Sequence, residues 1–424
     1  MEVVIKPGEI NGSIRAIESK SYAHRALICA AFADRPTEIT CRALSDDIEA
    51  TIGCLRALGA DITRDNDRIW VVPMGEHSTA AVLDCKESGS TYRFILPCVC
   101  INGIEASFKL GGRLPARPMD LFWSLVERRG VKVRGKGNET VCVSGRLEGN
   151  KFVIPGNISS QYISGLVMAL GMSGRKAVIE ITDTIESLGY INITLDIVNK
   201  FGVKTEFVGN TITVYGEKRY KSGGKLTIEG DWSNSAFWLC AAAAQGKEIT
   251  CKGLNTKSIQ GDRAVCEILE RFGARLEYGE DFVTVKASEE GQRLHGITID
   301  AKNTPDLIPA IAAVAAASEG ETVVTGAARL RLKESDRLET VSATVNKLGG
   351  KAEVQEDGLI ITGTRLMGGD VDGCGDHRIV MLSAILSTRC EKDVRIKGAE
   401  ACEKSYPAFF DDFKSLGGKV EIIN

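Results

Sequence analysis

Positively charged side chains in this 424-residue sequence stand at the beginnings of segments that are otherwise apolar. Lys20 and Arg25 open KSYAHRALICAAFA, Arg93 lies in SGSTYRFILPCVC, and Arg378 follows Asp376 in DHRIVMLSAIL. The start of a helix presents unpaired backbone N–H groups and the positive end of the helix dipole, and a guanidinium group adds paired donors. Phosphate and carboxylate oxygens need such donors, so the sequence predicts anionic ligands.

Further polar groups accompany these cations. Hydroxyl, amide and imidazole groups stand at the same segment starts, namely Ser21, Ser90, Ser159, Ser160, Gln161 and His377. Three more clusters supply charge: Arg113 and Arg117 in GGRLPARPMD, Lys333, Glu334 and Arg337 in RLRLKESDRLE, and Lys404 in EKSYPAFF. Taken singly, KESDR is typical of a solvated helix start, SSQ of an N-cap and His377 of a surface histidine. Together they share one chemistry, which favours a functional site.

A repeated pattern predicts how these residues are positioned. A helix that ends in glycine, a charged strand, a polar turn and a second strand recur along the chain, which is typical of a capped helix and a hairpin. The capping glycines are Gly59, Gly130, Gly202, Gly273, Gly349 and Gly417. Their spacings of 71, 72, 71, 76 and 68 residues indicate six repeats of about 71 residues.

A second helix repeats in phase with the first. Its six copies are rich in small apolar residues and begin near Lys20, Ser90, Ser160, Ser233, Asp306 and Asp376. Each repeat thus contains a buried helix, an amphipathic helix and several strands, a βαβαββ-type unit of an α/β protein. We expect two similar domains of three units with buried parallel helices. One domain covers residues 15–228, and the other joins residues 1–14 to 229–424.

The composition narrows the functional classes. A net charge of -3 without basic tracts argues against a nucleic-acid-binding protein, and the longest apolar runs are too short to span a bilayer. The segment MEVVIKPGEI lacks the features of a secretory signal, so we expect a cytoplasmic protein with reduced cysteines. No CxxC pair occurs, and His24, His77, His295 and His377 are scattered, so we expect no metal.

The motifs KSYAHR, GSTYR, ARP, SSQ, PD, KESDR, DHR and EKSYP, in this order and spacing, resemble the 5-enolpyruvylshikimate-3-phosphate (EPSP) synthases. The resemblance covers the whole chain. It implies a monomeric enzyme of two three-repeat domains, with the active site in the cleft between them. It also implies enolpyruvyl transfer from phosphoenolpyruvate to the 5-hydroxyl of shikimate 3-phosphate in the shikimate pathway to chorismate and aromatic amino acids, without a cofactor.

The resemblance assigns residues to both substrates. It implies that shikimate 3-phosphate contacts Lys20, Ser21, Arg25, Ser159, Ser160, Gln161, Ser187, Asp306 and Lys333, with Tyr190 stacked on its ring. For phosphoenolpyruvate it implies Lys20, Gly89, Arg117, Gln161, Glu334, Arg337, Arg378 and Lys404. The catalytic residues would be Asp306, which accepts the hydroxyl proton, and Glu334 or Lys20, which exchange protons at the methylene carbon.

Two positions depart from the common family pattern. Arg329 stands where many members have asparagine, and Glu87 replaces another frequent asparagine ahead of Gly89. A small residue at Gly89 leaves room for glyphosate in the phosphoenolpyruvate site of this family. We therefore expect glyphosate to inhibit the protein in competition with phosphoenolpyruvate.

Two alternatives remain open at this point. The sister enzymes that transfer enolpyruvate to UDP-N-acetylglucosamine share the repeat fold, but they commonly carry a cysteine in the loop before their ARP-like motif, where this chain has Arg113. An inactive repeat scaffold would keep the glycines and lose the charged residues. Neither a GxxxxGK[ST] nor a strand-linked GxGxxG motif occurs, which argues against common nucleotide-binding enzymes.

Overall fold

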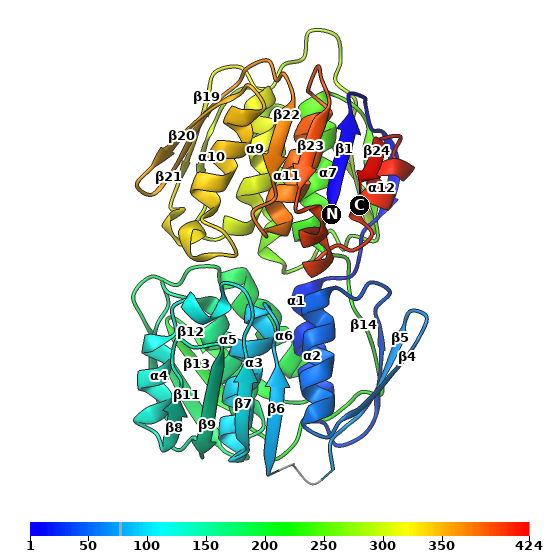
Figure 1. Cartoon of the computed structure of the whole chain (residues 1–424). Helices are drawn as coiled ribbons and strands as arrows, with labels where there is room; N and C mark the ends of the chain where they lie inside the picture. The colour runs from blue at the N-terminus through cyan, green and yellow to red at the C-terminus, as the bar shows by residue number, and fades with distance from the viewer. Residues whose placement is uncertain (76–78, 424) are drawn as a thin grey trace. The chain divides into compact units, whose positions relative to one another are not determined.

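The architecture is taken from a computed structural model, which describes residues 1–75 and 79–423. These residues form 24 β-strands and 12 α-helices, so the predicted α/β class is confirmed. The chain divides into two compact units. We call Glu18–Ile228 the first domain, and Met1–Ile17 together with Glu229–Asn424 the second domain. Figure 1 colours the first domain from blue to green, and the second from green to red apart from its dark-blue N-terminal strands.

Six four-stranded sheets share one pattern of strand directions. In the first domain, β6 (Ala80–Asp84) runs parallel to β7 (Glu105–Lys109), which is antiparallel to β9 (Thr140–Gly145), and β9 is antiparallel to β8 (Val131–Arg134). The same order describes β14 (Lys225–Thr227), β3 (Thr37–Thr40), β5 (Arg68–Val72) and β4 (Asp61–Asp65), and also β10 (Lys151–Pro155), β11 (Lys176–Thr182), β13 (Thr211–Tyr215) and β12 (Lys204–Val208).

The second domain repeats this order three times. Its sheets are β2 (Gly12–Arg15), β15 (Ile249–Lys252), β17 (Phe282–Val285) and β16 (Leu276–Tyr278); β18 (Thr298–Asp300), β19 (Glu321–Thr325), β21 (Gly358–Thr362) and β20 (Lys351–Gln355); and β22 (Gly369–Asp372), β23 (Val394–Lys397), β1 (Glu2–Lys6) and β24 (Lys419–Ile423). The N-terminal strand β1 therefore completes the sheet formed by the last strands of the chain.

Two connections join the domains in the chain. Strand β2 ends at Arg15, which pairs with Lys252, and the backbone N–H of Asp231 donates to the carbonyl of Ile17 at 2.7 Å. These bonds keep residues up to 17 with the second domain, whereas sequence patterning puts the boundary after residue 14. The return connection lies between Ile228 and Glu229.

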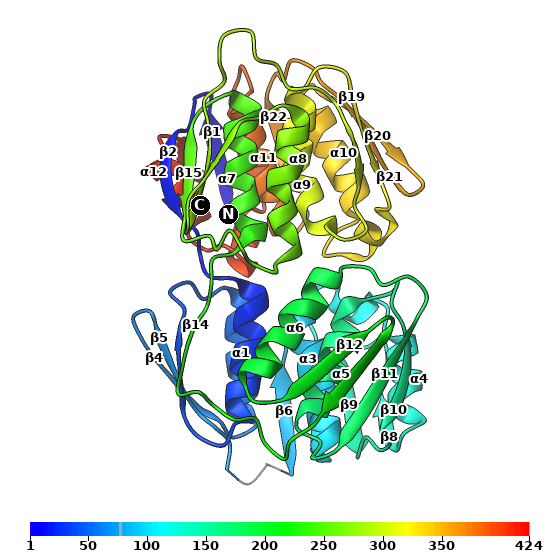
Figure 2. The ribbon, with the colours of Figure 1, turned by 180° about the vertical axis from the view of Figure 1, so that it is seen from behind.

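Each domain has three central helices that are almost completely buried. They are α1 (Lys20–Ala31), α3 (Gly89–Asn102) and α5 (Ser160–Gly171) in the first domain, and α7 (Trp232–Gln245), α9 (Ile308–Ala317) and α11 (His377–Ser387) in the second. Alanine, glycine, serine and cysteine let these helices approach closely, as in the sequence IPAIAAVAAA of α9. The two opposite views show strands toward the outside of each domain and helices packed within it (Figures 1 and 2).

Side-chain caps begin four of the central helices. Ser88, Ser159, Asp231 and Asp376 accept backbone N–H groups at the starts of α3, α5, α7 and α11. The capping residues of α3 and α7 are thus Ser88 and Asp231, each two residues before the predicted start. Helix α9 is instead preceded by the short 3-10 helix η3 (Pro305–Leu307), which contains Asp306.

The remaining helices lie beside the central ones. They are α2 (Asp46–Ala57), α4 (Asp120–Glu127), α6 (Leu188–Lys200), α8 (Val265–Phe272), α10 (Arg337–Lys347) and α12 (Phe409–Ser415), with the 3-10 helices η1 (Leu114–Ala116), η2 (Gly261–Ala264), η4 (Ala328–Leu332) and η5 (Ala399–Lys404). The six predicted capping glycines follow these helices with φ between +79° and +106°. Left-handed backbone of this kind favours glycine. Within the described part of the chain, no helix combines the length and apolar character needed to cross a membrane.

Candidate active site

In the first domain, the starts of α3 and α5 are joined by side-chain hydrogen bonds. Gln161, the second residue of α5, donates to Ser90 Oγ at 3.0 Å and accepts from Arg93 Nη1 at 2.7 Å. The Arg93 side chain is buried and also lies over the ring of Tyr162. These bonds hold the Gln161 amide and the Arg93 guanidinium at two adjacent helix starts, where the backbone favours anions.

Arg117 also lies at the start of α3. A methyl group on Gly89 would stand 2.8 Å from Arg117 Nη1 and 3.1 Å from Arg93 Nη1, so both guanidinium groups crowd the first residue of α3. Arg117 Nε is buried and has no hydrogen-bond partner among the described residues. A buried donor of this kind costs free energy unless a ligand or water satisfies it. The predicted phosphoenolpyruvate residues Gly89, Arg117 and Gln161 are therefore close together.

Lys20 begins α1 and forms an ion pair with the start of α2. Its Nζ atom lies 2.8 Å from Asp47 Oδ2, and both side chains are largely buried. The carbonyl of Asp47 in turn accepts the hydroxyl of Thr91 from α3 at 3.2 Å. The start of α2 thus connects Lys20 to the group around Gly89, and it fixes a long side chain that would otherwise be free to rotate.

Arg25 has a structural function in the first domain. It donates to Thr194 Oγ1 at 2.6 Å, to the carbonyl of Ser21 at 2.6 Å and to the carbonyl of Tyr190 at 3.1 Å. Burial lowers its pKa to about 10, which leaves it charged at neutral pH. Arg25 therefore ties α1 to the first turn of α6, where Tyr190 lies, and contact with the substrate stays a prediction for it.

The predicted serines occupy helix starts. Ser159 caps α5 by accepting the backbone N–H of Gln161 at 3.3 Å, and Ser160 follows as the first residue of that helix. Ser187 precedes α6 with a left-handed backbone, φ 56°, although it has a side chain. Such backbone strain at a buried residue is common in binding sites.

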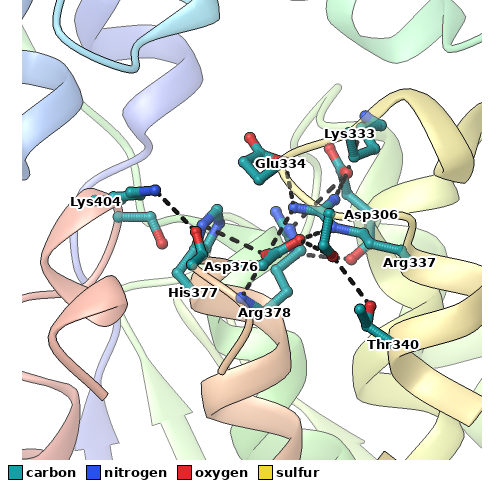
Figure 3. A network of polar contacts seen from close by, with 12 residues as sticks. Asp306, Lys333, Glu334, Arg337, Thr340, Asp376, His377, Arg378 and Lys404 are labelled. Atoms are coloured by element: carbon teal, nitrogen blue, oxygen red, sulfur yellow. Dashed lines mark hydrogen bonds and ion pairs between the residues drawn. The ribbon is translucent and has the colours of Figure 1, made fainter. Parts of the chain in front are cut away.

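In the second domain, Arg337 at the start of α10 is the centre of a charged network (Figure 3). Its guanidinium group donates to Asp376 at 2.8 and 3.1 Å, to Asp306 at 2.7 Å and to Glu334 at 2.7 Å. Only 1% of the Arg337 side chain is exposed. Burial opposes its charge, but Asp376, Glu334 and Asp306 together raise its pKa above the ordinary value. Arg337 is therefore a fixed cation.

Two further cations face Asp306. Lys333 Nζ lies 3.1 Å from Asp306 Oδ1, and Arg378 donates to the carbonyl of Asp306 at 2.7 Å. Burial lowers the pKa of Lys333, Arg337 and Arg329 lower it further, and Asp306 and Glu334 oppose them. Three cations around one carboxylate can stabilise a second, bound anion.

Asp376 is the buried counter-charge of this network. Burial alone would raise its pKa, but the Arg337 guanidinium beside it holds the pKa below its usual range. Its carboxylate also caps α11 through the N–H of Arg378 at 3.0 Å. Lys404, at the end of η5, donates to the carbonyl of Gly375 at 2.8 Å (Figure 3). The predicted residues Asp306, Lys333, Glu334, Arg337, Arg378 and Lys404 thus lie around one group of helix starts.

The sequence predicted no specific partner or substrate for several residues of these clusters. Asp47 is the partner of Lys20, Arg93 is the partner of Gln161, and Ser233 accepts Arg378 Nη2 at 2.7 Å. Arg93 and Asp376 stand in the helix-start motifs that predicted anionic ligands, but neither was assigned to one of the two substrates. For Asp47 the available signal was SDD before a helix, which is common at ordinary N-caps.

The two residues that depart from the family pattern lie beside the clusters. Arg329 donates to the carbonyl of Lys302 at 3.0 Å, and the carboxylate of Glu87 lies against Gly112. No group of three or more His, Cys, Asp or Glu side chains that could hold a metal occurs within residues 1–75 and 79–423. His77 lies outside the described residues.

Comparison with known proteins covers nearly the whole chain. Residues 4–413 match the family model described as EPSP synthase (3-phosphoshikimate 1-carboxyvinyltransferase). A 3-phosphoshikimate 1-carboxyvinyltransferase of Clostridium acetobutylicum is 39% identical, over 99% of this chain and 98% of the relative. One of Clostridium perfringens is 41% identical, over 98% of both chains.

The fold agrees with solved structures. An EPSP synthase from Acinetobacter baumannii superposes with a TM-score of 0.80 at 24% identity, over 99% of this chain and 100% of the other. An enolpyruvyl transferase from Streptomyces tendae gives a TM-score of 0.81 at 16% identity, over 99% and 98%. At these identities the likeness concerns the fold alone. The family model and the two clostridial relatives show that the chain belongs to the EPSP synthase family.

Proposed function

We propose that the protein transfers the enolpyruvyl group of phosphoenolpyruvate to the 5-hydroxyl of shikimate 3-phosphate and releases phosphate. The observation that carries this proposal is the set of cations fixed around Asp306, which are Lys333, Arg337 and Arg378. They combine the charge needed for two anionic substrates with a carboxylate that can accept a proton. The curated relatives named 3-phosphoshikimate 1-carboxyvinyltransferase support the same activity.

We propose the following contacts for the two substrates. Shikimate 3-phosphate is bound by Lys20, Ser21, Arg25, Ser159, Ser160, Gln161, Ser187, Tyr190, Asp306 and Lys333. Phosphoenolpyruvate is bound by Lys20, Gly89, Arg117, Gln161, Glu334, Arg337, Arg378 and Lys404. The buried Arg117 Nε atom supports the second assignment, because a phosphate or carboxylate oxygen would satisfy it.

The reaction is an addition followed by an elimination. The methylene carbon of phosphoenolpyruvate gains a proton, and the 5-oxygen of shikimate 3-phosphate bonds to the neighbouring carbon while its own proton passes to Asp306. Phosphate then leaves the tetrahedral intermediate, and the new methyl group loses a proton to restore the double bond. Glu334 or Lys20 exchanges protons at that carbon, and the Arg337 guanidinium holds both Asp306 and Glu334.

The cations act electrostatically. Arg337 is fixed by three carboxylates before any ligand binds, so its reorganisation during the reaction is small. Charge that develops on the departing phosphate is stabilised by Arg117, Arg337, Arg378 and Lys404. This chemistry needs neither a cofactor nor a metal. We propose a monomer in the cytoplasm, where the free thiols of all thirteen cysteines would stay reduced.

The test is phosphate release from phosphoenolpyruvate by the purified protein. One arm contains shikimate 3-phosphate, a second contains UDP-N-acetylglucosamine, and a third contains no acceptor. We expect release only in the first arm. Release only with the sugar nucleotide would reassign the acceptor, and no release in any arm would indicate an inactive scaffold.

A further inference from the structure

Arg378 is held by a serine whose own hydrogen is available to another group. Arg378 Nη2 donates to Ser233 Oγ at 2.7 Å, at the start of α7. A guanidinium group only donates, so the hydroxyl oxygen is the acceptor in this bond. The hydroxyl hydrogen of Ser233 must then point to a different acceptor. That acceptor determines where the serine oxygen lies, and hence where Arg378 lies.

Asp262 is the carboxylate positioned to accept this hydrogen. It lies in η2 and is 4% exposed, and Gln260, two residues before it, accepts the N–H of Trp232, which directly precedes Ser233, at 3.2 Å. The Ser233 hydroxyl lowers the pKa of Asp262, as a hydrogen bond from the serine to the carboxylate does. The charged groups that change the pKa of Asp262 are Asp306 and Asp231, which raise it, and Arg378, which lowers it. An Asp262–Ser233–Arg378 chain therefore reaches from η2 to the substrate cations.

The segment that carries Asp262 is firmly anchored. Gln260 donates to Glu229 Oε1 at 2.6 Å and to the carbonyl of Gly230 at 2.8 Å, and it accepts the N–H of Trp232 at 3.2 Å. Ser258 also bonds to Glu229. These contacts tie the loop before η2 to the residues that lead into α7. The carboxylate of Asp262 and the hydroxyl of Ser233 thus keep a fixed relation.

The charge on Asp262 does not stabilise the fold at neutral pH. Burial, and next the charge of Asp306, raise the pKa of Asp262 to about 6, although Arg378 and Ser233 oppose them. A carboxyl group whose pKa is raised by folding makes the folded state less stable above that pKa, because folding must keep it ionised in an unfavourable place. A buried aspartate whose charge makes the folded state less stable is more easily explained by a function than by a contribution to stability.

We propose that Asp262 is a positioning residue for the enolpyruvyl-transfer reaction, and that it orients Arg378 toward anionic substrate through the hydroxyl of Ser233. This inference rests on the proposed function. The ionised carboxylate of Asp262 accepts the Ser233 hydroxyl more strongly than the protonated form does. Asp262 therefore positions Arg378 above pH 6, and this effect weakens below pH 6.

The test compares Asp262→Asn, Ser233→Ala and the double variant with the wild type. Asp281→Asn, an exposed acid between β16 and β17 of the same domain, is the matched control. We expect Asp262→Asn to raise the KM for phosphoenolpyruvate on the order of tenfold, as loss of one charge-assisted hydrogen bond does. The KM for shikimate 3-phosphate should change far less. The double variant should be no worse than Ser233→Ala, because both act on one chain of bonds.

Two readouts separate positioning from a structural role. The melting temperature of Asp262→Asn at pH 7.5 should equal or exceed that of the wild type, since a buried charge is removed. The ratio of wild-type to Asp262→Asn kcat/KM for phosphoenolpyruvate should be largest above pH 7 and approach one below pH 5.5. Titration of the substrate affects both proteins equally and cancels in this ratio.

A lower melting temperature with an unchanged KM would overturn the inference, and so would a pH-independent ratio or additive effects in the double variant. Failure of the proposed function has a different signature. In that case the wild type itself would release no phosphate with shikimate 3-phosphate. An active wild type whose kinetics Asp262→Asn leaves unaltered would contradict the role of Asp262 alone.

Discussion

At the scale of single residues, two clusters place cations where movement is restricted. One lies around Gly89 in the first domain, and the other lies around Asp306 in the second domain. Arg337 bonds to three carboxylates, and Arg117 and Arg93 crowd against Gly89. In both cases neighbouring groups hold the guanidinium in place, whereas a solvent-exposed arginine side chain would be free to move. Substitutions at such places should affect binding through the neighbours that they displace.

Gly89→Ala is the first prediction. The added methyl would stand 2.8 Å from Arg117 Nη1 and 3.1 Å from Arg93 Nη1, so both side-chain ends must shift. Because the displaced groups are proposed to bind phosphoenolpyruvate, its KM should rise by roughly tenfold to a hundredfold. Glyphosate should also inhibit more weakly. Steady-state kinetics measures both effects. An unchanged KM for phosphoenolpyruvate would show that phosphoenolpyruvate does not bind beside Gly89.

Arg337→Gln is the second prediction. It leaves Asp376 and Asp306 without their main cation, and removing one partner from a buried ion pair costs about 3–5 kcal/mol. Urea denaturation at pH 7 measures this loss, and enolpyruvyl transfer should disappear. The exposed pair of Arg293 with Glu319 is a suitable control, since Arg293→Gln should change the free energy of unfolding by about 1 kcal/mol or less.

The loss of stability in Arg337→Gln should depend on pH because of Asp376. Its pKa in the folded wild type is lowered, so the stability that it contributes is present above about pH 4, the ordinary value for an aspartate, and is lost as the pH falls further. In Arg337→Gln the same buried carboxylate lacks its cation and favours protonation. The stability difference between the two proteins should therefore shrink as the pH falls from 7 toward 4. A constant difference would contradict this account.

At the scale of elements, helix starts determine where the polar groups are. Four of the six central helices are capped by their own serine or aspartate side chain, and all six begin beside residues of the two clusters. The cap of α3 is Ser88, which accepts the N–H of Thr91 at 3.2 Å and its hydroxyl at 2.7 Å. This cap positions Gly89 and Ser90, which follow it directly.

Ser88→Ala is the third prediction. Loss of an N-cap costs about 1 kcal/mol, and it frees the first turn of α3. We expect a loss of that size in urea denaturation together with a raised KM for phosphoenolpyruvate. Ser124→Ala, at an exposed position of α4, serves as the control and should change neither quantity. Equal effects of the two substitutions would argue against the cap.

At the scale of the whole molecule, the second domain is assembled from the two ends of the chain. Strand β1 pairs with both β23 and β24, and β2 pairs with β15. The first domain instead consists of one continuous segment with its own apolar core. Its size is ordinary for an independent domain.

The fourth prediction concerns the two segments produced separately. Residues 18–228 should fold alone, as measured by cooperative thermal unfolding in circular dichroism. Residues 229–424 lack β1 and β2, which leaves three unpaired strand edges, so we expect them to aggregate or to remain without a cooperative transition. Fusing residues 1–17 back through a flexible linker after residue 424 should restore folding. A cooperative transition in 229–424 alone would contradict the role assigned to β1.

The sequence by itself determined the local features of this protein. The helix starts, the six glycines with left-handed backbone, the α/β class and the charged motifs could be read from it, because caps, turns and periodicity depend on neighbours within a few residues. Its motifs also indicated the EPSP synthase family, which the comparisons confirmed.

Only the tertiary structure decided which partners those residues meet. Lys20 pairs with Asp47 from another helix, Arg25 holds the carbonyl of Tyr190, and Glu2 is registered with Lys397 at the far end of the chain. Asp262 lies near Asp306 and Arg378 for the same reason. Such contacts depend on how distant segments pack and on which charges share a desolvated place, and no local pattern encodes that.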